Sequence, residues 1–75
     1  MNYKRIYDDI ICKAKNRGLN KSLIPYYTEK HHIIPKCLGG DNSSNNLVLL
    51  TGREHYLCHH LLWKLDKSNK LLFYP

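Results

Sequence analysis

The spacing of apolar residues near the N-terminus predicts an amphipathic helix. Apolar side chains recur there every three or four positions, which places them on one helical face. These residues are Tyr3, Ile6, Tyr7, Ile10, Ile11 and Ala14. Asn2 is suited to cap the start of the helix, and Gly18 suits the position after its end, where Lys15 and Arg17 favour the negative end of the helix dipole. We expect residues 1–18 to form a supporting helix with a solvated basic face, although contact of that face with phosphate stays open.

The middle of the chain predicts two strands around a polar loop. After a connector over residues 19–27, the segment from Tyr26 to Ile34 is rich in β-branched and aromatic residues and ends at Pro35. Residues 37–46 are dense in glycine, asparagine and serine, which favour turns. The apolar run 47–50 is a candidate for a second, short strand. Two strands that flank a loop of this kind predict an antiparallel pair.

A capping box predicts where the last helix begins. The Thr51 hydroxyl can accept from the amide of Glu54, while the Glu54 carboxylate reaches back to the Thr51 amide. We therefore expect a helix from Gly52 to about Leu65 and a fraying tail after Asp66. Its packing side chains are expected to be Leu57, Leu61, Leu62 and Trp63. The predicted order is helix, strand, loop, strand, helix, which is an α+β fold.

The chain length and its hydropathy limit the class of protein. Seventy-five residues suit one small domain, and chains of this size often gain stability from a metal or a partner. The longest apolar runs hold four residues, whereas a membrane span needs about 20. The first ten residues lack the apolar stretch of a signal peptide. We expect a soluble cytoplasmic protein that contacts no membrane.

The charge balance favours an anionic partner. Lysine and arginine number 12 against 6 aspartates and glutamates, which gives a net charge of +6 and a pI near 9.4. Eight of the basic residues and three of the acidic residues lie at or before Lys36. Nucleic acid is the commonest partner of so basic a domain, but a solubilising surface explains the same composition.

The cysteines give no sign of a disulfide framework or a zinc ribbon. Cys12, Cys37 and Cys58 are an odd number of widely spaced residues without a C-x-x-C pair. Free thiols are typical of a reducing cytoplasm. We expect all three to be structural or incidental.

Five histidines between positions 31 and 60 carry the candidate chemistry. His55 and His59 are four residues apart on the predicted helix, so their rings share one face and can chelate a metal; a partly exposed surface pair is the alternative. His31 and His32 are neighbours on a strand, so their side chains point to opposite faces. One of the two can then join a metal while the other moves protons. His60 faces away from the His55–His59 side and is expected at the surface.

Four segments in order resemble the HNH endonuclease family, and the small phage-type and homing-type nucleases within it in particular. The segments are EKHHIIP at 29–35, GG at 39–40, NNLVLL at 45–50 and REHYLCH at 53–59. The resemblance covers residues 29–63, and the helix at 3–17 is also similar to segments that precede the motif in such phage proteins. The family has a ββα-metal fold, also called the His-Me finger, in which two antiparallel strands and a helix surround one divalent ion. The resemblance implies such a core over 28–66 behind the N-terminal helix.

The resemblance implies a role for each residue that matches the family motif. His32 matches the general base that activates water, with a hydrogen-bonded structural histidine as the alternative. His31 matches the metal ligand before that base, and His55 matches the helix ligand. His59 matches a second helix histidine that is a ligand in some members only. Asn46 matches the central asparagine that fixes the loop and orients the base, although a plain turn residue stays open.

Two basic residues lie next to the implied site in sequence. Lys36 and Arg53 could hold the scissile phosphate or stay solvated. The chain departs from the larger family because it lacks the two C-x-x-C pairs of a structural zinc. It also lacks the DNA-binding module that follows the nuclease core in homing-type relatives. We therefore expect a minimal or truncated nuclease without sequence-specific targeting.

The resemblance implies a DNA endonuclease that uses one divalent ion (Mg²⁺, Mn²⁺, Ni²⁺ or Zn²⁺) and leaves 5′-phosphate and 3′-hydroxyl ends. It further implies a phage-encoded protein in a bacterial host, acting as a monomer or a homodimer. Two alternatives stay open. One is a non-catalytic DNA-binding module whose zinc is held by histidines with Cys37 or Cys58. The other is a small basic protein that docks on RNA, although its tyrosines do not form an alternating strand platform.

Overall fold

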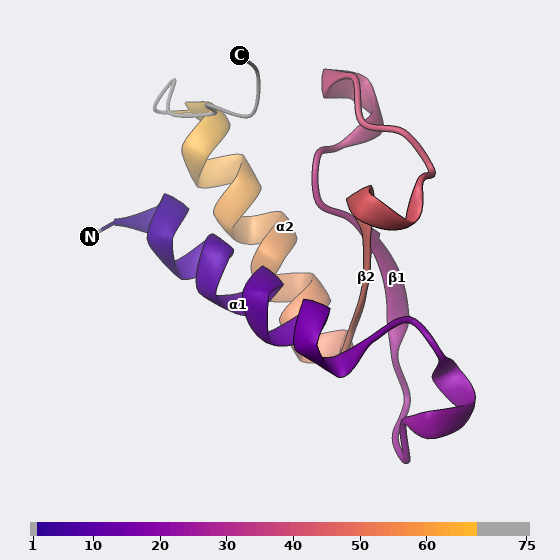
Figure 1. The fold of residues 1–75 in the computed structure, drawn as a ribbon. Coiled ribbons are helices and arrows are strands. Elements are labelled where there is room, and N and C mark those ends of the chain that lie inside the picture. The colour runs from indigo at the N-terminus through magenta and orange to yellow at the C-terminus, as the bar shows by residue number, and fades with distance from the viewer. Residues whose placement is uncertain (1, 68–75) are drawn as a thin grey trace.

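The computed structural model describes residues 2–67 and has an α+β architecture, as predicted (Figure 1). Two helices and two strands follow in the order α1 (Tyr3–Arg17), β1 (Glu29–His32), β2 (Leu47–Leu50) and α2 (Gly52–Lys67). Short 3₁₀ helices interrupt the connectors at Lys21–Leu23, Lys36–Leu38 and Ser44–Asn46. The expected fraying after Asp66 falls mostly on residues 68–75, which lie outside the described residues.

The two strands form the predicted antiparallel pair, but the first strand is shorter than the sequence suggested. His31 pairs with Val48 and His32 with Leu47, and the ladder holds four residues on each strand. A strand over 26–34 was therefore wrong at both ends. The physical reason is the partner: β2 supplies only four residues, so the neighbours of β1 have no strand to pair with and follow the loop instead.

Both ends of α1 are capped as predicted. Asn2 Oδ1 accepts from the Arg5 amide at 3.1 Å. At the other end, Gly18 has a φ of +90° and its amide donates to the Ala14 carbonyl at 3.2 Å. Only glycine adopts this φ without steric cost, so the chain leaves the helix at that residue.

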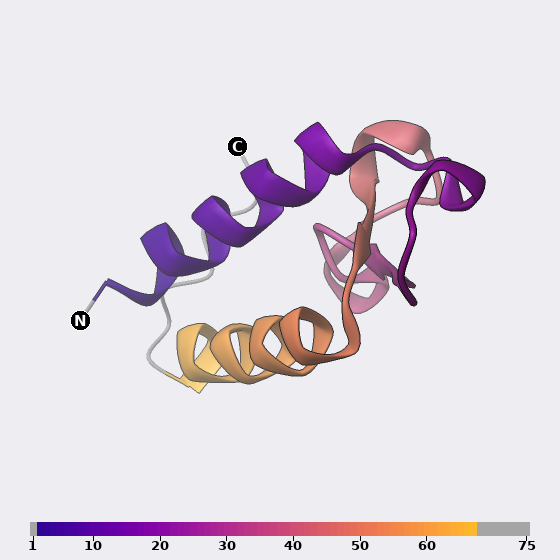
Figure 2. The ribbon, with the colours of Figure 1, turned by 90° about the horizontal axis from the view of Figure 1, so that it is seen from below.

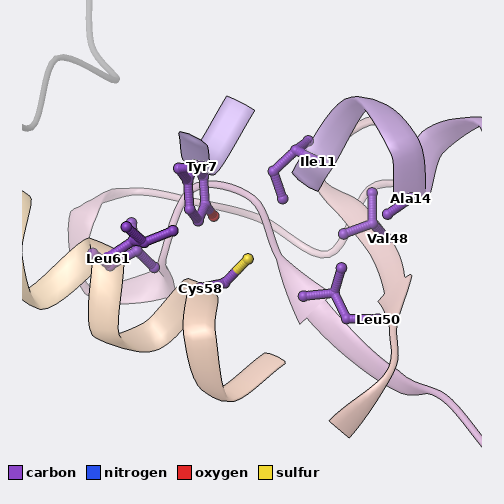
Figure 3. Packing of buried hydrophobic residues seen from close by; sticks show 8 residues of the cluster. Tyr7, Ile11, Ala14, Val48, Leu50, Cys58 and Leu61 are labelled. Carbon is purple, nitrogen blue, oxygen red and sulfur yellow. The ribbon is translucent and has the colours of Figure 1, made fainter. Parts of the chain in front are cut away.

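The core lies between the two helices and β2 (Figures 2 and 3). Its buried members are Tyr7, Ile11 and Ala14 of α1, Val48 and Leu50 of β2, and Cys58, Leu61 and Leu62 of α2. The predicted apolar face of α1 is confirmed, since Tyr3, Ile6 and Ile10 pack against this cluster. Two of the side chains expected to pack from α2 are instead exposed, Leu57 at 40% and Trp63 at 53%. Their positions on the helix turn them away from α1 and β2.

An ion pair joins the end of α1 to the start of α2. Both guanidinium nitrogens of Arg17 donate to the Glu54 carboxylate, at 2.7 and 3.0 Å, and Nη1 also donates to the Leu49 carbonyl at 2.7 Å. Arg17 is therefore largely buried and is not part of the solvated basic face expected for α1. The same carboxylate completes the predicted capping box with Thr51, through distances of 2.9 and 3.2 Å.

The remaining expectations concern the cysteines and the membrane. All three thiols are free, with Cys58 in the core and Cys12 and Cys37 exposed. Among the described residues, no helix is both long and apolar enough to cross a membrane.

Candidate metal centre

The fold brings together three of the histidines that the sequence singled out. His31 comes from β1, and His55 and His59 come from successive turns of α2. One ring nitrogen from each residue lies within 4.8 Å of the other two, and the Nε2 atoms of His55 and His59 are 3.0 Å apart. The ring centroids are 4.7 to 5.4 Å from one another. Among residues 2–67 this is the group of histidine, cysteine and acidic side chains whose geometry suits a metal ion.

Tyr7 of α1 determines which nitrogen of His31 carries the proton. The Tyr7 hydroxyl donates to the Ile33 carbonyl at 2.7 Å and lies 2.8 Å from His31 Nε2. A hydroxyl has one proton, so its oxygen must accept the proton of His31 Nε2. The neutral His31 ring then has its lone pair on Nδ1.

Burial keeps the His31 ring neutral. His31 is 3% exposed, and this burial, followed by the nearby rings of His55 and His59, lowers its pKa to about 4. Burial and the neighbouring His55 also lower the pKa of His59. Neutral imidazoles are the form that binds metals.

Glu29 orients the second histidine. Its Oε1 lies 2.8 Å from His55 Nδ1, and its Oε2 accepts from the Tyr27 hydroxyl at 2.8 Å. The hydrogen bond with His55, followed by that with Tyr27, lowers the pKa of the Glu29 carboxyl below its ordinary value. An ionised carboxylate can only accept, so His55 donates from Nδ1 and has its lone pair on Nε2, the nitrogen next to His59.

His32 lies beside the group but does not join it. Its Nε2 is 2.7 Å from Asn42 Oδ1, an acceptor, so the neutral ring is protonated on Nε2 and has its lone pair on Nδ1. His31 and His32 turn to opposite faces of β1, as predicted from strand geometry: His31 contacts Tyr7 and His32 contacts the loop. His32 lines the same cleft as the three clustered histidines.

Asn46 fastens the loop that runs between the strands. Its side chain accepts from the Ile34 amide at 2.8 Å and donates to the carbonyls of Ile34 and Asp41 at 3.1 and 2.8 Å. Its own carbonyl accepts from the Ile33 amide at 2.8 Å. Gly40 is required here because a Cβ at that position would collide with the Ile34 carbonyl. The loop that holds Asn42 against His32 is thus fixed by Asn46, which agrees with the expected structural part of its role.

The two predicted phosphate contacts differ in their position. Lys36 lines the histidine cleft, which has a volume of about 490 Å³. Arg53 is exposed on the first turn of α2 and is absent from the lining of that cleft. His60 is exposed, as predicted. Cys37 lines the cleft without joining the histidine group, and Cys58 is buried in the core.

Sequence reasoning missed three residues that support the histidines. Tyr7 was identified only as part of an apolar stripe, and its hydroxyl gave no indication of a partner 24 positions away. Glu29 stood inside the quoted motif, two residues before His31, and a carboxylate close to a histidine cluster was the available signal. Asn42 was described as a turn former, and nothing local marked it as a partner of His32.

Comparison with known proteins finds relatives among phage endonucleases. The chain is 53% identical over 74 residues to probable mobile endonuclease D of Enterobacteria phage T4, covering 99% of this chain and 29% of that protein. Probable mobile endonuclease B of the same phage is 55% identical over 71 residues, covering 95% and 27%. Probable mobile endonuclease E is 42% identical over 73 residues, covering 97% and 49%.

No family model and no solved structure matches the chain. The chain spans between about a quarter and a half of the length of the three phage relatives. Similarity along nearly all of this chain to proteins named as endonucleases supports a nuclease family for it.

Proposed function

We propose that this chain is an HNH-type nuclease domain that hydrolyses phosphodiester bonds in DNA with one divalent metal ion. The observation that carries the proposal is the cluster of His31, His55 and His59 with His32 beside it in one cleft. The phage relatives support a phage-encoded protein that acts in the host cell, and their endonuclease names agree with DNA as the substrate.

The residues present fit a metal ion on the chemistry of their donors. Hydrogen bonds to Tyr7 and Glu29 leave His31 and His55 each with one unprotonated nitrogen, the usual arrangement of metal-binding histidines. Three neutral imidazoles suit zinc, nickel and other transition metals, and three protein ligands leave positions for substrate or water. A divalent ion held here would supply Lewis-acid polarisation of the scissile phosphate and charge stabilisation for the departing 3′-oxygen.

His32 is the general base in this proposal. Its Nδ1 lone pair is available to take a proton from the attacking water because Nε2 is occupied with Asn42. Removal of that proton while the water attacks phosphorus is the step that a positioned imidazole accelerates, typically by about 10²–10⁴-fold. Asn46 positions the base indirectly, through the loop that carries Asn42.

Basic side chains attract the DNA backbone. Lys30 and Lys36 lie on the cleft, and the chain has a net charge of +6. Phosphate contacts of this kind give affinity without reading sequence. Arg53 would contact a phosphate outside the cleft.

The histidine arrangement favours this proposal over a structural zinc module. Such a module would be expected to use cysteine sulfur, yet among residues 2–67 neither Cys37 nor Cys58 joins the histidine group. A structural site would also leave His32 and its Asn42 partner without a task.

A plasmid assay tests the proposed activity. Supercoiled plasmid is incubated with the protein after dialysis against a chelator, and then after return of Mg²⁺, Mn²⁺, Ni²⁺ or Zn²⁺ in separate reactions. We expect nicked or linear product with at least one metal and none with the chelator. Cleavage that is unaffected by the chelator would contradict metal-dependent catalysis, and no cleavage with any metal would contradict nuclease activity.

A further inference from the structure

Trp63 does not serve the core, although it is the largest apolar side chain on α2. It is 53% exposed, and it lines the same cleft as His55 and His59. It follows His59 by one helical turn, so the indole borders the histidine cluster on the side toward the end of α2. A tryptophan that remains half exposed forgoes much of the burial energy it could gain, and such side chains are enriched where proteins bind ligands.

The walls near Trp63 combine apolar surface with positive charge. Pro35, Leu38 and Leu62 add apolar atoms to the lining. Lys30 and Lys36 add two positive charges, against one carboxylate from Asp66. A nucleotide has this pair of properties, an aromatic base on a sugar beside a negative phosphate, so the cleft is complementary to it.

We propose that Trp63 forms a nucleoside subsite of the cleft, where its indole packs on the base or deoxyribose of a nucleotide that flanks the phosphate at the histidine cluster. The inference rests on the proposed function, because it assumes that DNA enters this cleft. Stacking on an aromatic ring tolerates any base, since every base has a π-face. Trp63 would then fix the position of the chain along the strand without selecting a sequence.

Two neighbouring side chains border the indole and leave more than half of the residue exposed. The Lys64 ammonium is 5.7 Å from the ring centroid, and the His60 ring is 6.0 Å away at an interplanar angle of 29°. A lysine at this distance places positive charge where the phosphate next to a stacked base would run. Both neighbours are therefore compatible with a bound nucleotide.

The fluorescence of the protein itself can test the subsite, because Trp63 is the only tryptophan in the chain. The experiment uses the metal-loaded His32→Ala variant, in which the metal ligands are kept and cleavage is suppressed, and a gel confirms that the DNA stays intact. A short fluorescently labelled DNA duplex is titrated with this protein. Anisotropy of the label reports binding, and tryptophan emission is read in parallel with unlabelled duplex.

Three substitutions on α2 separate stacking from general effects. Trp63→Leu removes the ring and should raise the Kd for the duplex about 5- to 100-fold, the range expected for one lost base–aromatic stack. Trp63→Phe keeps a ring and should restore most of the affinity. Tyr56→Leu is the matched control, since Tyr56 is a 76% exposed aromatic of the same helix and is absent from the cleft lining. Melting temperature and metal affinity should be unchanged in all three variants.

The outcomes separate the subsite from the proposed function. Tryptophan emission that changes with the same midpoint as the anisotropy, together with weaker binding by Trp63→Leu alone, supports the subsite. Normal DNA binding with constant emission, or equal losses in Trp63→Leu and Tyr56→Leu, overturns the subsite and leaves the nuclease proposal intact. No anisotropy change at any protein concentration overturns DNA binding itself.

Discussion

Removal of one oxygen atom, in Tyr7→Phe, should weaken both the fold and the metal site. Tyr7 is fully buried, and its hydroxyl bonds to His31 Nε2 at 2.8 Å and to the Ile33 carbonyl at 2.7 Å. Phenylalanine keeps the ring that packs in the core, so the change removes only these two hydrogen bonds. The His31 N–H is then left buried without its acceptor.

The expected cost follows from the groups left without partners. A buried polar group without its partner costs about 1–3 kcal/mol, and the Ile33 carbonyl is only partly buried, so we expect about 2–3 kcal/mol in total. For a domain of this size that lowers the melting temperature by roughly 10–20 °C. Loss of a hydrogen bond that orients a metal-binding histidine typically weakens metal affinity by about 10–100-fold.

Three measurements check this prediction. Thermal unfolding by circular dichroism in chelator gives the stability change, and calorimetric titration with Zn²⁺ gives the metal affinity. Nitrogen-15 NMR of the histidine rings reports the protonated nitrogen of His31, which should be Nε2 in the wild type and a mixture in the variant. Tyr56→Phe makes the same chemical change at an exposed site and should leave all three readings unchanged. A Tyr7→Phe protein with wild-type metal affinity and an unchanged His31 ring would refute the assigned role.

Three further predictions concern the ion pair, the metal and the salt dependence. Arg17→Ala should cost about 2–3 kcal/mol at neutral pH in urea unfolding. The Arg17 hydrogen bond lowers the pKa of Glu54 to about 2, so wild-type stability should fall between about pH 4.5 and pH 2, and the variant should lose less over that range. Calorimetry should show a higher melting temperature with Zn²⁺ or Ni²⁺ than with chelator, by roughly 2.7 kcal/mol of stability at a hundredfold excess over Kd; an unchanged temperature argues against the site. DNA affinity should fall with salt at a log–log slope of about −0.9 per phosphate contact, and Lys36→Glu should weaken all sequences alike, whereas a sequence-dependent loss would indicate base reading.

The sequence predicted the elements that depend on local patterns. The caps of both helices could be foreseen because Asn2, Thr51 and Glu54 act on amides within three residues of themselves. The face of α1 followed from its periodicity. The strand limits did not, because the length of β1 is set by a partner strand on the far side of the loop.

Tertiary packing decided what the local patterns left open. Trp63 and Leu57 lie on a helix whose apolar residues extend around more than one face, and only the placement of α1 and β2 determines which of them are buried. Arg17 looked like a helix-terminal cation, yet it is held by Glu54, which lies 37 positions further along the chain.

The candidate site was foreseen in its histidines and missed in their supports. The helical spacing of His55 and His59 and the strand geometry at His31 are local properties, and the model brings the three rings together. Their hydrogen-bond partners Tyr7 and Glu29 lie more than 20 positions away from the rings they orient. The metal ligand roles, the base role of His32, the core limits at 28–66 and the oligomeric state stay predictions.

The central claim is that neighbouring histidines divide the work, His31 binding metal and His32 moving the proton. Calorimetric metal titration of His31→Ala and His32→Ala, beside plasmid cleavage by the same preparations, tests it most directly. The account predicts that His32→Ala keeps wild-type metal affinity and melting temperature while cleavage falls at least about a hundredfold. It predicts that His31→Ala loses metal affinity, with cleavage partly restored at high metal concentration. Lost metal binding in His32→Ala with intact binding in His31→Ala would contradict it and exchange the two roles.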